Sequence, residues 1–302
     1  MRASLKIVNQ ATLRPLFKLL RPYQWSKNLF LFGPLVFSKR LFEDQFVFPV
    51  LIGFCLFSIA SSSGYIFNDI RDIENDRQHP KKRNRPVASG RVSVPFAMGL
   101  SIILGITSVA ASFYVKPSFG LIVLGYLLLN TLYSITLKHL VILDVMAIAA
   151  GFVLRVMAGA KLVEVYPSNW LLICTILLSL FLGFSKRRHE LLLLPEKAQN
   201  HRKVLRHYSS YFLDQMIAVV TSATLMSYML YTVSEQTVQF FGTRHLIWTI
   251  PFVLYGIFRY LYLVHQKAEG GDPADTILGD LPMLFNFLLW VMTCILIIYY
   301  VK

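Results

Sequence analysis

The sequence predicts an all-α, polytopic membrane protein, and two observations lead to this prediction. Of the 302 residues, 55% are hydrophobic and 14% are aromatic, and the mean hydropathy of +0.55 is far above that of an ordinary soluble domain. The apolar residues gather into runs, most of them near the length at which a helix crosses about 30 Å of hydrocarbon. Nine transmembrane spans are expected, at residues 28–42, 46–67, 93–114, 118–137, 141–160, 169–185, 214–234, 246–265 and 282–301.

The sequence defines these spans unequally. The first is short, and Gly33 and Pro34 interrupt it, so its depth in the membrane is poorly defined. The fifth contains Arg155, an intramembrane cation for which we expect a structural role. Long charged connections follow the second and sixth spans, four spans apart, which hints at an internal duplication with a site between the halves. No change of composition divides the chain, so residues 1–302 are interpreted as a single integral-membrane domain.

The distribution of positive charge predicts an orientation. The formal net charge is +14. With the N-terminus placed in the cytoplasm, 22 of the 30 Lys and Arg residues fall on the cytoplasmic side, as the positive-inside rule requires. Both long charged connections then face the cytoplasm. Basic residues beside anionic headgroups need no nucleic acid to explain them, so no nucleic-acid partner is expected.

The first charged connection, from Asn68 to Gly90, is the strongest candidate for a chemical site. It reads NDIRDIENDRQHPKKRNRPVASG, with four acidic residues followed by a run of cations. On a helix, Asn68, Asp69, Asp72 and Asp76 fall within an arc of about 100°, so their oxygens can converge. Hard oxygen ligands at this spacing suit Mg²⁺ bound together with a diphosphate. A solvated, charge-balanced loop is the alternative, but the direct junction with a long apolar span favours a site.

Basic residues near this motif are candidates for phosphate binding. The cations that directly follow the acidic cluster can hold phosphate oxygens that a metal leaves uncovered; they are Lys81, Lys82, Arg83 and Arg85. Lys138 ends the fourth span near the same surface, where snorkelling to the headgroups is the alternative. The second charged connection begins with Lys186, Arg187 and Arg188, which form either a phosphate-binding cluster or an ordinary basic anchor. Successive helical residues diverge by about 100°, so these three cannot all reach one ligand.

These residues resemble the motifs of a known family. The segment from Asn68 is similar to the NDxxDxxxD motif of the UbiA superfamily of intramembrane prenyltransferases, and Tyr133 with Lys138 resembles a second signature. The stretches RPYQWSKN from Arg21 and KRRHEL from Lys186 are similar to the branch of that superfamily that transfers phosphoribose to polyprenyl phosphates. The resemblance covers nearly the whole chain. It implies nine helices in a UbiA-like bundle with cytoplasmic active-site loops, in a bacterial cytoplasmic (inner) membrane.

The branch implies a specific reaction. This is the Mg²⁺-dependent transfer of 5-phosphoribose from phosphoribosyl diphosphate to a polyprenyl (decaprenyl-like) phosphate, with release of diphosphate, for synthesis of cell-envelope glycan precursors. The resemblance makes Asn68, Asp72 and Asp76 the expected metal ligands, and Asp69, Asp72 and Asp76 the expected catalytic residues. The expected substrate-binding residues are Lys27, Lys81, Lys82, Arg85, Tyr133, Lys138, Lys186, Arg187 and Arg188. The oligomeric state is left open, and a homo-oligomer is compatible with the sequence.

One departure from the superfamily pattern bears on the substrate. Prenyltransferases of this superfamily that act on aromatic acceptors typically carry a second aspartate-rich motif after the sixth span, where this chain has Lys186, Arg187 and Arg188. Cations at that place suit a second phosphate group better than a second metal. Two alternatives stay open. One is a UbiA-type prenyltransferase that moves a prenyl group from a prenyl diphosphate to an aromatic acceptor. The other is a non-enzymatic lipid-binding or transport protein, which would more naturally bind its ligand near the bilayer midplane.

Overall fold

A computed structural model describes residues 10–80, 82–193, 203–267, 271 and 273–301. Within these ranges every regular element is a helix, which confirms the predicted all-α class. Eight helical segments among them are long and apolar enough to cross a membrane. They are α3 (Asp44–Arg71), α5 (Val94–Val115), α6 (Pro117–Ile135), α7 (Leu143–Val163), α8 (Asn169–Leu193), α10 (Ser210–Val233), η5 (His245–Thr249) continuing into α12 (Ile250–Gln266), and α14 (Leu281–Tyr300).

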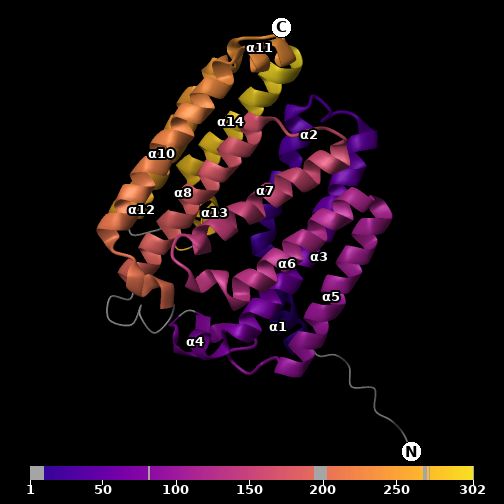
Figure 1. The fold of residues 1–302 in the computed structure, drawn as a ribbon, viewed down its shortest axis with the longest axis vertical. Coiled ribbons are helices and arrows are strands. Elements are labelled where there is room, and N and C mark those ends of the chain that lie inside the picture. Colours follow the sequence, from indigo (N-terminus) through magenta and orange to yellow (C-terminus); the bar gives the residue numbers. More distant parts are fainter. Residues whose placement is uncertain (1–9, 81, 194–202, 268–270, 272, 302) are drawn as a thin grey trace, which may run out of the picture.

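The first predicted span, residues 28–42, does not form a long helix, so the expected count of nine transmembrane helices is not confirmed. The chain passes from α1 (Gln10–Leu20) into the 3₁₀-helix η1 (Pro22–Phe32) and then into the short α2 (Gly33–Phe37). Pro34 has no amide hydrogen with which to continue a helical ladder. In Figure 1, η1 and α2 still carry the chain along the bundle, from α1 at one end to α2 at the other.

Small side chains allow close packing around η1. At Gly159 of α7, an added Cβ would lie 2.0 Å from the carbonyl oxygen of Leu31, so only glycine fits there. On α3, Ser58 and Ser61 are buried and form hydrogen bonds with the side chain of Asn28 of η1. Such small and hydroxylated residues are typical of helix interfaces in membranes. The packing fixes η1, and with it the residues that follow Arg21, against two long helices.

Arg155 of α7 is buried in the same region, with only 4% of its surface exposed. Its guanidinium donates to Asn28 Oδ1, to the hydroxyl of Tyr126 and to the carbonyl oxygen of Gly151, each at 2.8 Å. An intramembrane cation is costly unless such partners surround it. The contacts therefore agree with the structural role expected for Arg155.

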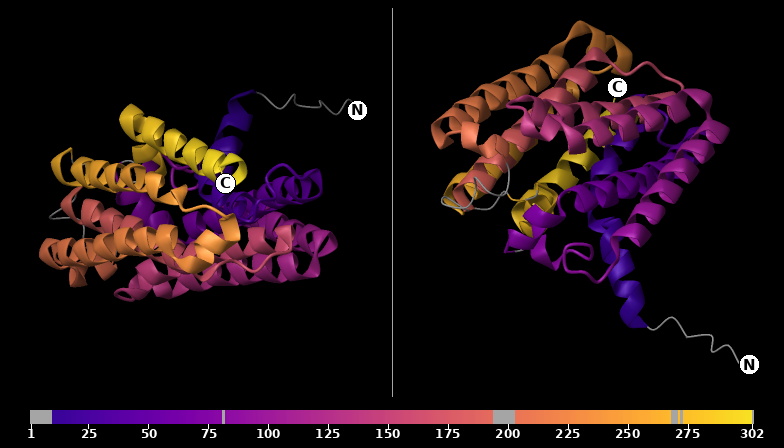
Figure 2. Two further views of the ribbon diagram at one scale, coloured as in Figure 1. Left: turned by 90° about the horizontal axis from the view of Figure 1, so that it is seen from above. Right: turned by 60° about the horizontal axis from the view of Figure 1, so that its bottom comes forward.

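Consecutive long helices run in opposite directions, so four of their connections share one end of the bundle. These connections contain α4 (Ile73–Gln78) with η2 (Lys82–Asn84), η3 (Leu137–His139), η4 (Lys203–His207) and α13 (Pro273–Gly279). Figure 1 shows α1 and α4 at this end, and α11 (Glu235–Phe241) with the C-terminus at the opposite end. The further views in Figure 2 show the long helices packed side by side, with α14 at the edge of the bundle. The two charged connections thus begin from helices that end on the same side.

Candidate active site

A cavity of about 1480 Å³ lies between the long helices and opens near the charged connections. Its polar end is formed by α3, α4, η2 and η3. The remainder is mainly apolar and includes Phe152, Leu171, Phe287 and Trp290 from α7, α8 and α14. Pockets for small ligands usually measure about 300–1,000 Å³. This cavity therefore has room for a polar ligand together with part of a lipid chain.

The acidic motif lies at the polar end. Backbone hydrogen bonds continue in steps of four residues, from Asp72 N to Asn68 O at 3.0 Å and from Asp76 N to Asp72 O at 2.8 Å, although Asp72 itself departs from helical geometry. Asn68, Asp72 and Asp76 are therefore stacked one turn apart, and all three line the cavity. Asp69 does not line it. This residue is 1% exposed and forms ion pairs with Arg21 and with Arg85, whose Nη1 lies 3.0 Å from Asp69 Oδ1.

Both carboxylates of the acidic motif that line the cavity, those of Asp72 and Asp76, have a basic partner. Lys138 Nζ lies 2.5 Å from Asp72 Oδ1 and 3.5 Å from Asn68 Oδ1. Asn68 Nδ2 donates to Asp72 Oδ2 at 3.0 Å. Arg85 Nη1 lies 2.6 Å from Asp76 Oδ2. The cations and carboxylates hold one another in place, and each pair includes one residue expected to bind metal and one expected to bind phosphate.

The carboxyl group of Asp76 is buried as well as paired, with an exposed fraction of 3% for the residue. Burial raises the pKa of Asp76 above its usual value, while the guanidinium of Arg85 opposes the rise. Burial disfavours a charged carboxylate, and a nearby cation favours it. The ionised form of Asp76 therefore depends on Arg85 or on another cation close by.

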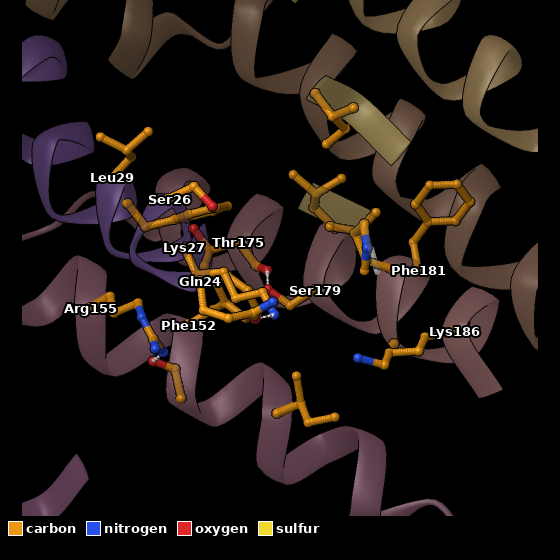
Figure 3. Close-up of a pocket in the computed structure, with 18 of the residues that line it drawn as sticks. Gln24, Ser26, Lys27, Leu29, Phe152, Arg155, Thr175, Ser179, Phe181 and Lys186 are labelled. Carbon is orange, nitrogen blue, oxygen red and sulfur yellow. Dashed lines mark hydrogen bonds between the residues drawn. The ribbon is translucent and has the colours of Figure 1, made fainter. Parts of the chain in front are cut away.

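Other expected substrate-binding residues also line the cavity: Lys27, Lys82 and Tyr133. Lys81 falls outside the described residues. Figure 3 shows Gln24 and Lys27 of η1 reaching into the cavity from one wall and Lys186 of α8 from the opposite wall. Lys27 Nζ donates to Gln24 Oε1. Cations that are far apart in the sequence thus lie on opposite walls of one cavity.

The three adjacent cations of α8 have different surroundings. Lys186 lines the cavity. Arg187 reaches the cavity wall but is 1% exposed, and its Nε lies 2.9 Å from Asp144 Oδ2 of α7. Arg188 does not line the cavity, and its Nε lies 2.5 Å from Asp214 Oδ1 of α10. The directions of the three side chains diverge, as the geometry of consecutive helical residues requires.

Three further cations line the cavity although no substrate-binding role was predicted for them from the sequence: Arg21, Arg206 and Arg155, whose buried partners are described above. Arg21, the first residue of RPYQWSKN, forms the ion pair with Asp69, and Arg206 lies on η4. Arg21 could have been found from that motif, whereas Arg206 is one of many arginines in a basic connection and gives no separate signal. Within the part of the chain that the structure describes, nine Lys and Arg residues and four Asp and Glu residues line the cavity. This excess favours a strongly anionic ligand.

The oxygen donors at the polar end suit Mg²⁺ only in company with a ligand. Among the described residues, no group of three or more His, Cys, Asp and Glu side chains could hold a metal ion. Mg²⁺ often takes one or two carboxylates together with substrate phosphates and water. Asp72 and Asp76, with the amide oxygen of Asn68, supply such a partial set. The residues therefore fit a Mg²⁺ ion whose coordination is completed by substrate oxygens.

Comparison with known proteins defines the class to which this fold and site belong. The model of the UbiA prenyltransferase family matches residues 29–276, and the chain belongs to this family. It is 33% identical over 290 residues to decaprenyl-phosphate phosphoribosyltransferase of Corynebacterium glutamicum, a match that covers 94% of this chain and 86% of that protein. It is 31% identical over 280 residues to the Mycobacterium tuberculosis protein of the same name, which covers 91% of each chain.

A solved structure has the same fold. The UbiA homologue from Archaeoglobus fulgidus bound to DMAPP and Mg²⁺ superimposes with a TM-score of 0.70 and 18% sequence identity, over 94% of this chain and 99% of that one. The likeness confirms the UbiA-like helical bundle expected from the motifs. The family and the apolar helices together establish a multi-pass integral membrane protein.

Proposed function

We propose that this enzyme transfers the 5-phosphoribosyl group of phosphoribosyl diphosphate to the phosphate of a polyprenyl lipid and releases diphosphate. One observation carries the proposal: a single cavity joins the Asn68, Asp72 and Asp76 set and an excess of cations to a long apolar region. The first part suits a phosphorylated donor, and the second suits a prenyl chain. The two decaprenyl-phosphate phosphoribosyltransferases described above, similar over most of the chain, support this choice of substrates.

The nucleophile of this reaction needs no base from the protein. A phosphate monoester has a second pKa of about 6, so the lipid phosphate is largely ionised at neutral pH. Its oxygen forms a bond to C1 of the ribose while the bond from C1 to the diphosphate oxygen breaks, and diphosphate leaves with the bonding electrons. No proton has to move. The protein's tasks are to hold two anions at reacting distance and to stabilise the departing charge.

The cations around the acidic motif are assigned to the donor phosphates. Lys82, Arg85 and Lys138 line the polar end. Arg85 presents a planar fork of donors that suits phosphate oxygens, whereas the lysines act as compact charges. Tyr133 lines the same end, where its hydroxyl can add a hydrogen bond. These four residues would fix C1 of the ribose relative to the acceptor.

Asn68, Asp72 and Asp76 are the residues that would hold Mg²⁺. When bound, this ion supplies Lewis-acid stabilisation of the charge that develops on the leaving diphosphate. We assign Asp69 a supporting role, because it shares the guanidinium of Arg85 with Asp76 and does not face the cavity. Its contribution to catalysis would then be to orient Arg85.

The acceptor phosphate is assigned to the space between η1 and α8. Lys27 and Lys186 enter that space from opposite walls (Figure 3). The apolar region beyond them would take the prenyl chain. Arg187 would support Lys186 from within the wall, because it is held by Asp144. By the positive-inside rule, this end of the bundle would face the cytoplasm of a bacterial inner membrane, where soluble phosphoribosyl diphosphate can enter.

A transfer assay on the purified protein in detergent tests the proposal. Labelled phosphoribosyl diphosphate, a polyprenyl phosphate and Mg²⁺ should give labelled lipid and free diphosphate, and chelation of Mg²⁺ should stop the reaction. A parallel reaction would contain a prenyl diphosphate and an aromatic acceptor. A prenylated aromatic product without pentose on lipid would replace the proposal with the prenyltransferase alternative. Lipid binding with neither reaction would favour a lipid-binding or transport protein.

A further inference from the structure

The connection that carries Lys138 ends in a strained turn. Ile142, the residue before α7, has φ 67° and ψ −44°, and Leu143 N donates to Val141 O across it at 2.8 Å. This is a γ-turn with positive φ, a rare and strained conformation, and a β-branched side chain is a pronounced outlier there. Strain of this kind persists only where surrounding contacts enforce it, and it clusters at functional sites.

The side chain of Tyr208 is hydrogen-bonded to the turn. The hydroxyl of Tyr208, the residue after η4, accepts a hydrogen bond from Ile142 N at 2.7 Å and donates one to Asp144 Oδ1 at 2.8 Å. Tyr208 is 5% exposed, and burial raises the pKa of its hydroxyl to about 12. The hydroxyl therefore keeps its proton at neutral pH and remains a donor to Asp144.

Asp144 extends this contact to α8. Its side chain is fully buried, and its second oxygen forms the ion pair with Arg187, which also contacts Glu190. Removal of either partner would leave an uncompensated buried charge, which is strongly destabilising. The turn at Ile142, the start of α7 and the charged end of α8 are thus joined through the hydroxyl of Tyr208.

Each segment joined in this way presents a cation to the cavity. Lys138 lies on η3, Lys186 on α8 next to Arg187, and Arg206 on η4, two residues before Tyr208. Tyr208 itself does not line the cavity, and neither does Ile142 or Asp144. Its hydroxyl therefore acts on any ligand only through the positions of other side chains.

We propose that Tyr208 is a positioning residue, which fixes Lys138, Lys186 and Arg206 relative to one another so that they bind the phosphates of the substrates. This inference rests on the proposed function, because it concerns the same cavity. A tyrosine that served only folding would change the amount of active enzyme and so lower the apparent kcat. A tyrosine that places Lys138 changes the KM for the donor.

The test begins with Tyr208→Phe, which removes both hydrogen bonds but keeps the ring stacked on Phe212, with ring centroids 5.9 Å apart. We expect the KM for phosphoribosyl diphosphate to rise about tenfold, as for the loss of one buried hydrogen bond, with a smaller change in kcat. The matched control is Tyr211→Phe, three residues further along, where the side chain is 74% exposed. That variant should behave as wild type.

A second substitution tests the link to the strained turn. Glycine adopts positive φ without strain. The double variant Tyr208→Phe with Ile142→Gly should therefore have a donor KM close to that of the wild type. Hydrogen exchange of a peptide covering residues 136–144 gives a readout that does not depend on the substrate. Exchange should be faster in Tyr208→Phe than in Tyr211→Phe.

These readouts separate this inference from the proposed function. If the wild-type protein transfers no phosphoribose, the proposed function fails, and hydrogen exchange still shows whether Tyr208 holds the turn. Unchanged exchange at residues 136–144 would overturn the inference. A lower kcat with an unchanged donor KM would also overturn it, as would a double variant that recovers nothing.

Discussion

The three adjacent cations of α8 should respond in three different ways when each is replaced by methionine, which keeps an apolar stem and removes the charge. Lys186 lines the cavity, Arg187 is buried in an ion pair, and Arg188 pairs with Asp214 away from the cavity. The substitutions Lys186→Met, Arg187→Met and Arg188→Met therefore remove charges of the same sign from one helical turn, but they act on different parts of the protein.

Lys186→Met should reduce activity and leave the protein folded. A hydrogen bond to a charged group contributes about 1.5–3 kcal/mol. Loss of one phosphate contact should therefore lower kcat/KM by roughly ten- to a hundredfold. The thermal midpoint in detergent should change little, because Lys186 faces the cavity rather than the packed core. Under the proposed function, the effect should be greatest on the KM for the lipid phosphate.

Arg187→Met should instead destabilise the protein. Asp144 has no exposed surface, and the substitution would leave its carboxylate buried without a cation. Breaking a buried pair in this way costs about 3–5 kcal/mol, a large share of the stability of a typical domain. Arg188→Met should be mild, because the Asp214 side chain is 38% exposed and pairs of that kind contribute about 0–1 kcal/mol.

The assay measures the thermal midpoint, membrane orientation and steady-state kinetics of all three variants. Orientation should be unchanged in each, because the many other cations on the same side still set it. Wild-type kinetics for Lys186→Met would refute the phosphate-binding role. A large kinetic defect in a stable Arg188→Met protein would show that the placement of the three side chains is wrong.

Three further predictions concern the centre of the site and its support. Asp72→Asn and Asp76→Asn should each fold normally and lose nearly all transfer activity. Chelation of Mg²⁺ should abolish the activity of the wild type in the same way. Full turnover of both variants in saturating Mg²⁺ would exclude the metal assignment. Lys138→Met should tighten Mn²⁺ binding measured without donor, because a competing cation is gone, and it should weaken donor binding. Weaker Mn²⁺ binding together with tighter donor binding would contradict the assignment of Lys138. Arg155→Met should lower the free energy of unfolding by about 1–3 kcal/mol, through the polar partners it leaves unsatisfied, and a stability equal to wild type would show that its network is dispensable.

The boundaries of the long helices show what hydropathy can predict. The ninth predicted span, residues 282–301, nearly coincides with α14 (Leu281–Tyr300). Polar residues and a proline lie there at the boundary of both the apolar run and the helix. The sixth span was predicted to end at residue 185, yet α8 continues to Leu193. Hydropathy marks where a helix leaves the hydrocarbon and not where its hydrogen bonds end. The first span failed in the opposite sense, because residues 29–32 are apolar but follow a 3₁₀ path instead of a long α-helix.

The candidate site was predictable where its geometry is local. The spacing of Asn68, Asp72 and Asp76 places them on one face of a helix, and all three line the cavity. Asp69 falls within the same arc but pairs with Arg21, which is 48 residues earlier. No local pattern indicates such a partner. The pairs of Lys138 with Asp72 and of Arg187 with Asp144 likewise depend on how distant helices pack.

The pair formed by Lys138 and Asp72 bears on how the site would select its ligand. The ammonium of Lys138 stands beside Asp72 Oδ1 and Asn68 Oδ1, the oxygens assigned to Mg²⁺. A divalent ion alone must displace that ammonium, and a phosphate alone must draw it away from a partly buried carboxylate, so each would bind at an electrostatic cost. A metal and a diphosphate bound together would offset both costs. Asp72 would then hold the metal in place of the ammonium, and the ammonium of Lys138 would be free to contact a phosphate oxygen. The site should therefore bind the metal–diphosphate complex more tightly than either component, and Lys138→Met should remove most of that difference.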